Sequence, residues 1–261
     1  MASPRTQQDS KELAFDPHFI VLDETPDYIV VDKPAPLQAH PSNPGCAPTL
    51  WDGLRDLLAF EIVNGGQVSI INRLDRETSG VTLIAKNAAT ARLFGLAMQA
   101  RQFQKTYLAV VLGWPAWEKK HADGPILRKG EVTPSPIWVK QMVHPDGVPC
   151  ETHFRVIERG GPAHLPLALV EAVPVTGRMH QIRVHLSALG HPVLGDKIYG
   201  TDETCYLDFI ETGWSVDLAA RLHLKRQALH AHRLRLTTDD FAADWVAPCP
   251  ALFTQALAGE V

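Results

Sequence analysis

The chain has 261 residues, of which 45% are apolar and 21% charged, and a net charge of −4. This composition excludes a disordered protein, and a pI of about 6.3 argues against a nonspecific nucleic-acid binder, although a local basic groove is compatible with it. The four cysteines lie far apart, and no apolar run approaches the ~20 residues that span a bilayer. A reduced, cytoplasmic setting is therefore expected.

The first part of the chain predicts a loose tail followed by strands and helices. Residues 1–15 are polar without a pattern, and the β-branched run at 28–31 predicts a strand that ends at the prolines after it. Residues 50–60 predict a helix. The apolar run at 81–85 predicts a buried strand, and Asn87 is placed to cap the helix that follows.

The second part of the chain predicts strands in runs, with helices between them. Strands are expected at 107–112, 152–157, 167–173 and 229–236. Apolar residues at helical spacing predict a helix over 179–189, whereas 114–150 is proline-rich and irregular. Because strict βαβ alternation is absent, the pattern predicts an α+β fold with a largely antiparallel sheet.

An aspartate between two arginines marks the first candidate site, in the stretch Arg73-Leu74-Asp75-Arg76-Glu77-Thr78-Ser79-Gly80. The guanidinium charges would lower the pKa of Asp75 and keep it ionised. An ionised carboxylate can act as a nucleophile or as a general base. A surface turn with a salt bridge is the alternative, and this stretch taken alone favours it.

A second candidate site gathers two arginines and two histidines where a strand hands over to a helix: Arg178, His180, Arg183 and His185. The positive end of the helix dipole suits an anion there, such as phosphate or carboxylate. Arg183 borders the apolar helix face, so we expect partial burial and an acidic partner. The alternative is a capped helix with solvated basic residues.

A third candidate is the short run Lys105-Thr106-Tyr107 at the start of an expected strand. Strand alternation places Lys105 and Tyr107 on the same side. A cation beside an aromatic ring suits a nucleotide, because the ring stacks on a base and the cation meets phosphate. A tyrosine that simply faces the core is the alternative.

Together these stretches resemble the RluA-like family of RNA pseudouridine synthases. Residues 73–80 resemble its RLDxxTSG motif, 105–107 its KxY motif, and 176–186 its TGRxHQIRxHL segment. Arg226 with 229–231 resembles its RxxLHA segment. Four features depart from the family pattern. The usual His before Arg-Leu-Asp is Asn72, and the usual Thr before His-Gln-Ile-Arg is Met179; the loop at 34–36 lacks the common glycine, and no His-Pro follows the final strand.

The resemblance implies a fold and a domain organisation. The expected fold is the pseudouridine synthase catalytic domain, an α+β domain with a mixed, mostly antiparallel sheet, flanking helices and a central active-site cleft. We expect it to occupy residues 16–261, without a separate N-terminal RNA-binding domain. Recognition would then come from the catalytic domain itself, which favours a compact stem-loop of tRNA or rRNA.

The resemblance also implies a reaction, the isomerisation of specific uridines to pseudouridine after the base is flipped out of its stack. It assigns Asp75 as the catalytic carboxylate, Tyr107 to stacking on the base, and Arg183 to pairing with the aspartate. Arg73 would fill the space left by the extruded nucleotide. Attack on C1′, attack on C6 and deprotonation of C2′ all remain open for the aspartate.

The remaining expectations concern partners and rival functions. Lys105, Arg178 and His180 are expected to contact RNA. The reaction changes no oxidation state and transfers no group, so neither a cofactor nor a metal is expected, and we expect a monomer without a membrane partner. The rivals are a catalytically silent RNA-binding or RNA-chaperone protein on the same fold, and a hydrolase that uses an Asp–His pair among the 12 histidines.

Overall fold

The computed structural model describes residues 19–42, 47–239 and 241–260. The tail expected at 1–15 lies outside the described residues. Within them the chain divides into two compact units, so the single domain expected over 16–261 stays a prediction. None of the helices in these ranges combines the length and the apolar character needed to cross a membrane.

The first unit comprises the described residues up to Gln102 together with 236–247. Its strands are β1 (Ile20–Glu24), β2 (Tyr28–Lys33), β3 (Ser69–Ile70), β4 (Ser79–Ala85) and β12 (Ala242–Val246), and its helices are α2 (Leu50–Leu57), α3 (Ala59–Val63) and α4 (Ala88–Gln99). Strand β2 lies between β1 and β4, and β3 also pairs with β4. These pairings are all antiparallel, and the strands expected at 28–31 and 81–85 are confirmed as β2 and β4.

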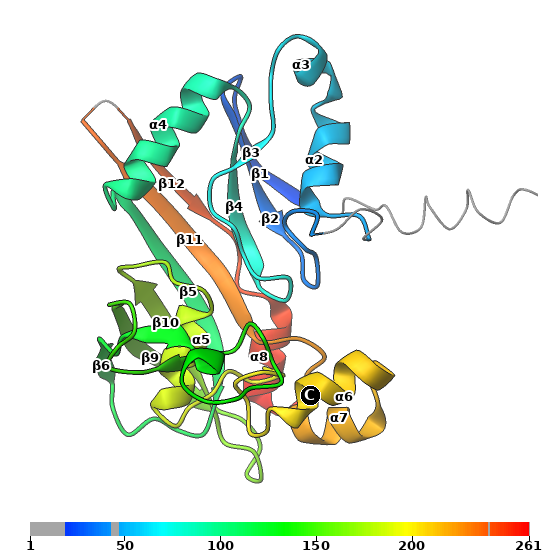
Figure 1. Cartoon of the computed structure of the whole chain (residues 1–261), viewed down its shortest axis with the longest axis vertical. Coiled ribbons are helices and arrows are strands. Elements are labelled where there is room, and N and C mark those ends of the chain that lie inside the picture. Colours follow the sequence, from blue (N-terminus) through cyan, green and yellow to red (C-terminus); the bar gives the residue numbers. More distant parts are fainter. Residues whose placement is uncertain (1–18, 43–46, 240, 261) are drawn as a thin grey trace, which may run out of the picture. The chain divides into compact units, whose positions relative to one another are not determined.

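Helices cover both faces of this small sheet, as Figure 1 shows for α2 and α4. Residues alternate along β2, so Ile29 and Val31 point to one face and pack in a core with Leu54 of α2. Tyr28 points to the other face, where its ring meets that of Phe94 from α4 at 5.9 Å between centroids. The strand is buried on both faces, which explains its continuous apolar run.

The helix expected over residues 50–60 is wrong in extent, because the chain breaks it at Leu58. Leu58 is buried and adopts φ −97° and ψ 24°, after which the short helix α3 begins. The apolar side chain of Phe60 is exposed, so nothing in the core holds it in line with α2. The cap expected at Asn87 is confirmed: its side chain accepts from the Thr90 N–H at 2.8 Å.

The second unit comprises residues 103–235 and the described residues from 248 onward. Its strands are β5 (Phe103–Leu112), β6 (Lys119–Ala122), β7 (Ile126–Arg128), β8 (Gln141–Val143), β9 (Thr152–Gly160), β10 (Leu167–Pro174) and β11 (Leu229–Thr237), the last running on into the first unit. Its helices are α5 (Gln181–Ala188), α6 (Thr204–Thr212), α7 (Val216–Leu222) and α8 (Ala251–Ala258), with a 3-10 turn η1 (Lys129–Glu131). Residues 114–150, which were expected to be irregular, thus contain β6, β7 and β8.

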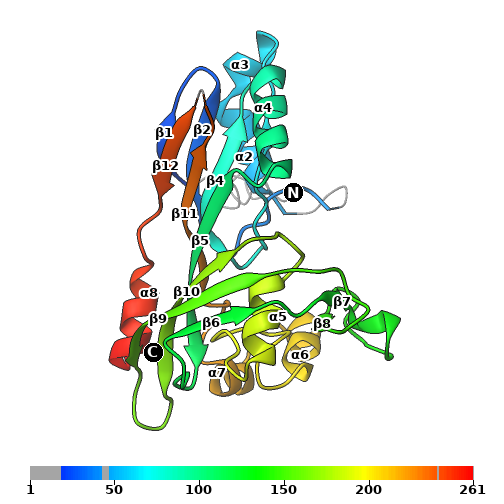
Figure 2. The ribbon, with the colours of Figure 1, turned by 90° about the vertical axis from the view of Figure 1, so that its left-hand side faces the viewer.

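The sheet of the second unit has the order β11-β5-β10-β9-β6. The β5–β10, β10–β9 and β9–β6 pairings are antiparallel. Helices α5 and α8 lie against opposite faces of β9 and β10 (Figure 2). Ile182 of α5 and Phe253 of α8 both enter the largest core cluster of the unit. The predicted α+β class with a mostly antiparallel sheet and flanking helices is confirmed.

The packing of α8 gives a stability prediction. Phe253 is fully buried, whereas its neighbour Thr254 is exposed. We expect Phe253→Ala to lower the free energy of unfolding by about 3–5 kcal/mol, because it removes a large side chain and leaves a cavity. Thr254→Ala is the matched control and should stay within about 0.5 kcal/mol of wild type in the same urea titration. Equal losses in the two variants would contradict the docking of α8.

Candidate active site

Asp75 lies in the turn between β3 and β4 of the first unit. The turn is closed by a hydrogen bond from the Thr78 N–H to the Asp75 carbonyl at 3.1 Å. Asp75 is half-buried, whereas Arg73 and Arg76 on either side are exposed. The turn therefore presents a carboxylate between two cations, as the sequence pattern predicted.

A buried lysine stabilises the turn that carries Asp75. Lys33 at the end of β2 is fully buried, and its ammonium group donates to the carbonyls of Pro34, Leu37 and Arg76 at 2.9, 2.7 and 3.3 Å. The Leu37 N–H also donates to the Arg76 carbonyl at 2.9 Å. Because a buried charge is costly unless it is hydrogen-bonded, Lys33 fixes the loop after β2 against the turn that carries Asp75.

Asn72 holds the same turn from its other end. Its amide donates to the Val81 carbonyl at 2.9 Å and accepts from the Leu83 N–H at 2.7 Å. The Asn72 amide thus makes the two hydrogen bonds with β4 that the backbone of a neighbouring strand would otherwise make. In the sequence, Asn72 stands out only as a departure from the family pattern, and nothing there predicts a role for Lys33. The one sequence signal was a lysine directly before a proline-bearing loop.

In the second unit, Lys105 of β5 lies against the turn that contains Gly177. A Cβ atom on Gly177 would stand 3.3 Å from the Lys105 Nζ, so the missing side chain leaves room for the ammonium group. Burial lowers the pKa of Lys105. A partly desolvated cation gains most from an anion that arrives beside it, which suits a phosphate contact.

Tyr107 lies two residues further along β5, opposite Ala172 of β10. It is half-buried and packs against the core of the second unit. The alternative of a tyrosine that faces the core therefore holds for part of the side chain. Its role in stacking on a base stays a prediction.

Gln181 shapes the turn between β10 and α5. Its carbonyl oxygen accepts from the Thr176 hydroxyl at 2.8 Å and from the Arg178 N–H at 3.0 Å. Its amide nitrogen donates to the Glu151 carbonyl at 2.8 Å and to the Thr152 hydroxyl at 2.9 Å. The buried amide therefore uses both of its groups to lock the turn, and the Arg178 side chain is left exposed.

His180 precedes α5 in the left-handed conformation, with φ 59°. Its Nδ1 atom lies 2.7 Å from the hydroxyl oxygen of Tyr199, and that oxygen also accepts from the Gln141 N–H at 2.9 Å. The imidazole is thus held at the start of the helix. A non-glycine residue with positive φ persists only where surrounding contacts fix it, which these bonds do.

Arg183 makes a buried, two-pronged ion pair with Asp196. Its Nε and Nη2 atoms donate to the two carboxylate oxygens at 2.6 and 2.9 Å, and the same carboxylate accepts from the N–H groups of Ile198 and Tyr199. Burial alone would raise the pKa of Asp196, but the Arg183 charge and these hydrogen bonds outweigh it and hold the pKa below its ordinary value. The burial and acidic partner expected for Arg183 are confirmed. Its pairing with Asp75 stays a prediction.

His185 belongs to the structure of the second unit rather than to its surface. It is buried, with Nδ1 at 3.0 Å from the Thr152 hydroxyl and Nε2 at 2.9 Å from the Gly124 carbonyl. Burial lowers the pKa of His185, so the ring is neutral at pH 7. Nε2 then donates to Gly124, and Nδ1 accepts from Thr152.

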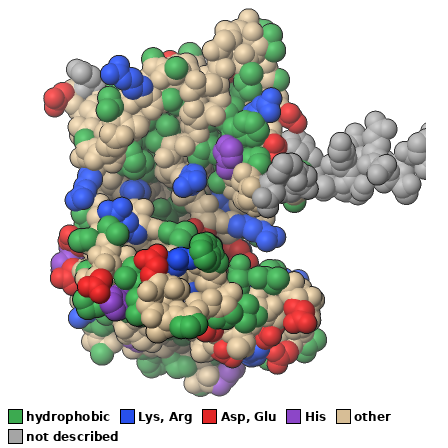
Figure 3. Space-filling view, in the orientation of Figure 1, with side chains coloured by type: hydrophobic (Ala, Val, Ile, Leu, Met, Phe, Trp, Pro, Cys, Tyr) green, Lys and Arg blue, Asp and Glu red, His purple; other side chains and the backbone are tan. Residues whose placement is uncertain are grey.

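The predicted site residues therefore form two groups, one in each unit. Arg73 and Asp75 share one turn of the first unit. The second unit holds Lys105, Tyr107, Arg178, His180 and Arg183. Within this group, Tyr199 links His180 to Arg183, whose guanidinium carbon lies 4.9 Å from the Tyr199 ring centre. On the face in Figure 3, basic side chains occur among acidic and apolar ones, as the small net charge leads one to expect.

Known proteins match this chain over the segment that contains several of the predicted site residues. A sequence profile described as RNA pseudouridylate synthase matches residues 27–188, a range that includes Asp75, Tyr107 and Arg183. An uncharacterized RNA pseudouridine synthase of Chloroflexus aurantiacus is 35% identical over 84% of this chain and 62% of that protein. Ribosomal large subunit pseudouridine synthase D of Nitrosomonas europaea is 35% identical over 83% of this chain and 57% of that protein. The chain thus spans about 60% of the length of these two relatives.

Further matches agree in sequence and in fold. The uncharacterized RNA pseudouridine synthase YhcT of Bacillus subtilis is 31% identical over 88% of this chain and 68% of that protein. The solved structure of human RNA pseudouridylate synthase domain containing 4 superposes with a TM-score of 0.71 at 26% identity, covering 96% of both chains. This chain therefore belongs to the RNA pseudouridylate synthase family, as an RluA-like member.

Proposed function

We propose that the protein isomerises specific uridines in structured RNA to pseudouridine. The main support for the proposal is the Asp75 carboxylate. It lies in a turn that is closed by a hydrogen bond, within the segment that matches the family. Relatives from Nitrosomonas europaea and Yersinia pestis are named for the large ribosomal subunit. Large-subunit rRNA is therefore the first substrate to test, ahead of tRNA, and a cytoplasmic location goes with either.

The proposed chemistry needs one carboxylate. The N1–C1′ bond of uridine breaks, the base turns and C5 joins C1′; the C5 proton is then lost and N1 takes up a proton, so the product is an isomer of the substrate. Asp75 acts as the nucleophile at C1′ or C6, or as the base at C2′. Tyr107 stacks on the base, and Arg183 supplies a fixed positive charge toward the aspartate. The buried pair with Asp196 supports a fixed charge, because it holds the guanidinium in one orientation within the second unit.

The uridine must leave its base stack before any of these atoms can react, at a cost of a few kcal/mol. Arg73 is exposed beside Asp75 and is proposed to fill the vacated space. Lys105, Arg178 and His180 are proposed to hold the RNA, with the cations at phosphates. Phosphate contacts of this kind position the RNA but carry little sequence information.

The assignment of Asp75 is tested with Asp75→Asn, which keeps the shape of the side chain and removes its charge. We expect tritium release from RNA labelled at uridine C5 to fall at least about 10²-fold, because an amide can serve neither as nucleophile nor as base. RNA affinity, measured by filter binding, should stay within about threefold of wild type, since the carboxylate contributes no attraction to an anionic ligand.

Glu77→Gln is the matched control, because it removes a half-buried carboxylate charge from the same turn. This variant should release tritium at the wild-type rate. Near-normal release from Asp75→Asn would remove Asp75 from the reaction. Absence of release by folded wild type from rRNA and tRNA, with RNA binding retained, would instead favour the silent RNA-binding protein.

Arg183→Lys tests whether the reaction needs the two-pronged contact of the Arg183 guanidinium with a carboxylate. Lysine keeps the charge but cannot offer two parallel N–H groups to a carboxylate. We expect tritium release to fall at least about tenfold, while the variant remains folded in a urea titration. Normal kinetics would remove Arg183 from the active site.

The pH dependence of the free energy of unfolding shows whether the Arg183–Asp196 ion pair is intact in wild type and in Arg183→Lys. The pKa of Asp196 is lower in the folded than in the unfolded chain, so its contribution to stability is present above its unfolded pKa of about 3.9 and is lost as pH falls through the folded pKa. Urea titrations of wild type from pH 7 to pH 3 should show this loss. Arg183→Lys should show a smaller loss, because the weaker pair lowers the pKa of Asp196 less.

Lys105→Met separates RNA binding from stability. The variant should weaken binding to all RNA sequences alike and reduce the slope of log affinity against log salt by about 1, as expected for one lost phosphate contact. Its free energy of unfolding should not fall, because the folded protein already disfavours the charged lysine. Lys225→Met, at an exposed site of the same unit, is the control. An unchanged salt slope in Lys105→Met would contradict the phosphate contact.

A further inference from the structure

Two histidines and a glutamate, none of them among the predicted site residues, meet on the surface of the second unit. The ligand atoms of His121, Glu151 and His153 all lie within 4.8 Å of one another. One Glu151 oxygen lies 2.9 Å from the Nε2 of His121 and 3.0 Å from the Nε2 of His153. The two rings are stacked, with centres 4.8 Å apart and an angle of 15° between their planes.

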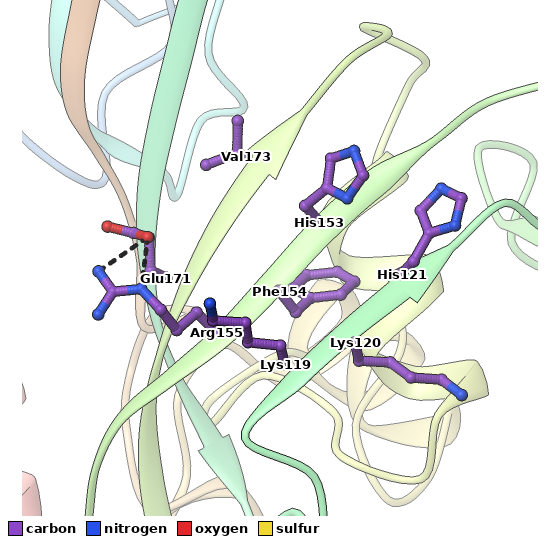
Figure 4. A pocket seen from close by; sticks show the side chains of 8 residues that line it. All are labelled: Lys119, Lys120, His121, His153, Phe154, Arg155, Glu171 and Val173. Carbon is purple, nitrogen blue, oxygen red and sulfur yellow. Dashed lines mark hydrogen bonds and ion pairs between the residues drawn. The ribbon is translucent and has the colours of Figure 1, made fainter.

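The strand register explains why these three side chains meet. His121 of β6 lies directly opposite His153 of β9, so both rings leave the sheet on the same face. Glu151 precedes His153 by two residues, which places it on that face as well. Figure 4 shows the two rings side by side, His121 from β6 and His153 from β9, at one end of a pocket of about 290 Å³.

The backbone of Glu151 is fixed more firmly than its exposed surroundings suggest. Its N–H donates to the Thr176 hydroxyl at 3.1 Å, and its carbonyl accepts from the Val175 N–H at 3.0 Å and from the Gln181 amide at 2.8 Å. The two histidines are held by the strand ladder. All three side chains therefore start from rigid backbone, which a preorganised ligand site requires.

We propose that His121, Glu151 and His153 bind a divalent transition-metal ion of the zinc type. Two imidazoles and a carboxylate are the donors that such ions take, and a fourth position is left for water. In a tetrahedral zinc site the donor atoms stand roughly 3.3 Å apart, close to the two contacts of 2.9 and 3.0 Å. On binding, each neutral ring offers Nε2 to the metal and carries its proton on Nδ1.

The cations around the cluster are either paired or exposed to solvent, so we expect them to weaken metal binding only slightly. Arg155, in the next row of the same face, is paired with Glu171, whose oxygen lies 3.1 Å from the Arg155 Nε and 3.0 Å from its Nη2. Figure 4 shows this pair pointing toward one another and away from the two rings. Lys119 and Lys120 are exposed, so solvent screens their repulsion.

The proposed metal site is separate from the proposed chemistry of the second unit. Tyr107 lies opposite Ala172 of β10, whereas His153 lies opposite the next residue, Val173. Because neighbouring residues of a strand point to opposite faces, the cluster and Tyr107 lie on opposite faces of the sheet. The sequence predicts no metal, because the implied reaction needs none. His121 and the Glu151–His153 pair are far apart in the chain, and the β6–β9 pairing brings them together.

The test is a calorimetric titration of the tag-free, chelator-treated full chain with zinc chloride. We expect saturable binding of one equivalent. The double variant His121→Ala/His153→Ala and the single variant Glu151→Gln should each weaken binding at least about tenfold, since even partners outside the ligand set change metal affinity 10–100-fold. His164→Ala, at an exposed histidine outside the cluster, should bind as wild type.

Cobalt(II) absorption identifies the ligands independently of affinity. Visible d–d bands without thiolate charge transfer, lost in the double variant but kept in His164→Ala, are the expected result. Three results would overturn the proposal: no saturable binding to wild type, full affinity in the folded double variant, or a thiolate band that places the ion on a cysteine. Circular dichroism of the double variant establishes that it is folded; both histidines are exposed, so their removal should leave the core intact.

Discussion

The buried ion pair between Arg183 and Asp196 is the constraint on which much of the second unit depends. The Asp196 carboxylate takes two bonds from the arginine and two from the backbone of the turn that follows it. That turn carries Tyr199, which reaches back to His180 and to the Gln141 N–H. Since an uncompensated buried charge would cost several kcal/mol, helix α5 and this turn are bound to a single arrangement.

In the first unit, too, buried polar groups fix a loop through their hydrogen bonds. Lys33 places a buried ammonium among three carbonyls, and Asn72 offers an amide to β4. Both units thus hold an exposed loop by a buried polar group whose hydrogen bonds are satisfied. Loops fixed in this way can carry reactive side chains in one orientation without placing those side chains in the core.

The sequence predicted those parts of the fold whose signal is local. The apolar run of β4, the cap at Asn87 and the helical spacing of α5 all follow from adjacent residues. Strand β6 was missed because its first three residues, Lys119, Lys120 and His121, are exposed and polar, so no alternation marks it. The motifs predict which residues form the site, and that assignment stays a prediction. The choice of Asp196 as the partner of Arg183, and the role of Lys33, depend on contacts between segments that only the folded chain brings together.

Asn72 shows how a departure from a family motif can be read physically. The amide donates to one strand residue and accepts from another, and it keeps both functions at every pH at which the protein is folded. A protonated histidine has no acceptor and would leave the Leu83 N–H unpaired inside the protein. With asparagine at this position, the placement of the turn that carries Asp75 is independent of titration there, so the pH dependence of the proposed reaction must come from groups other than residue 72.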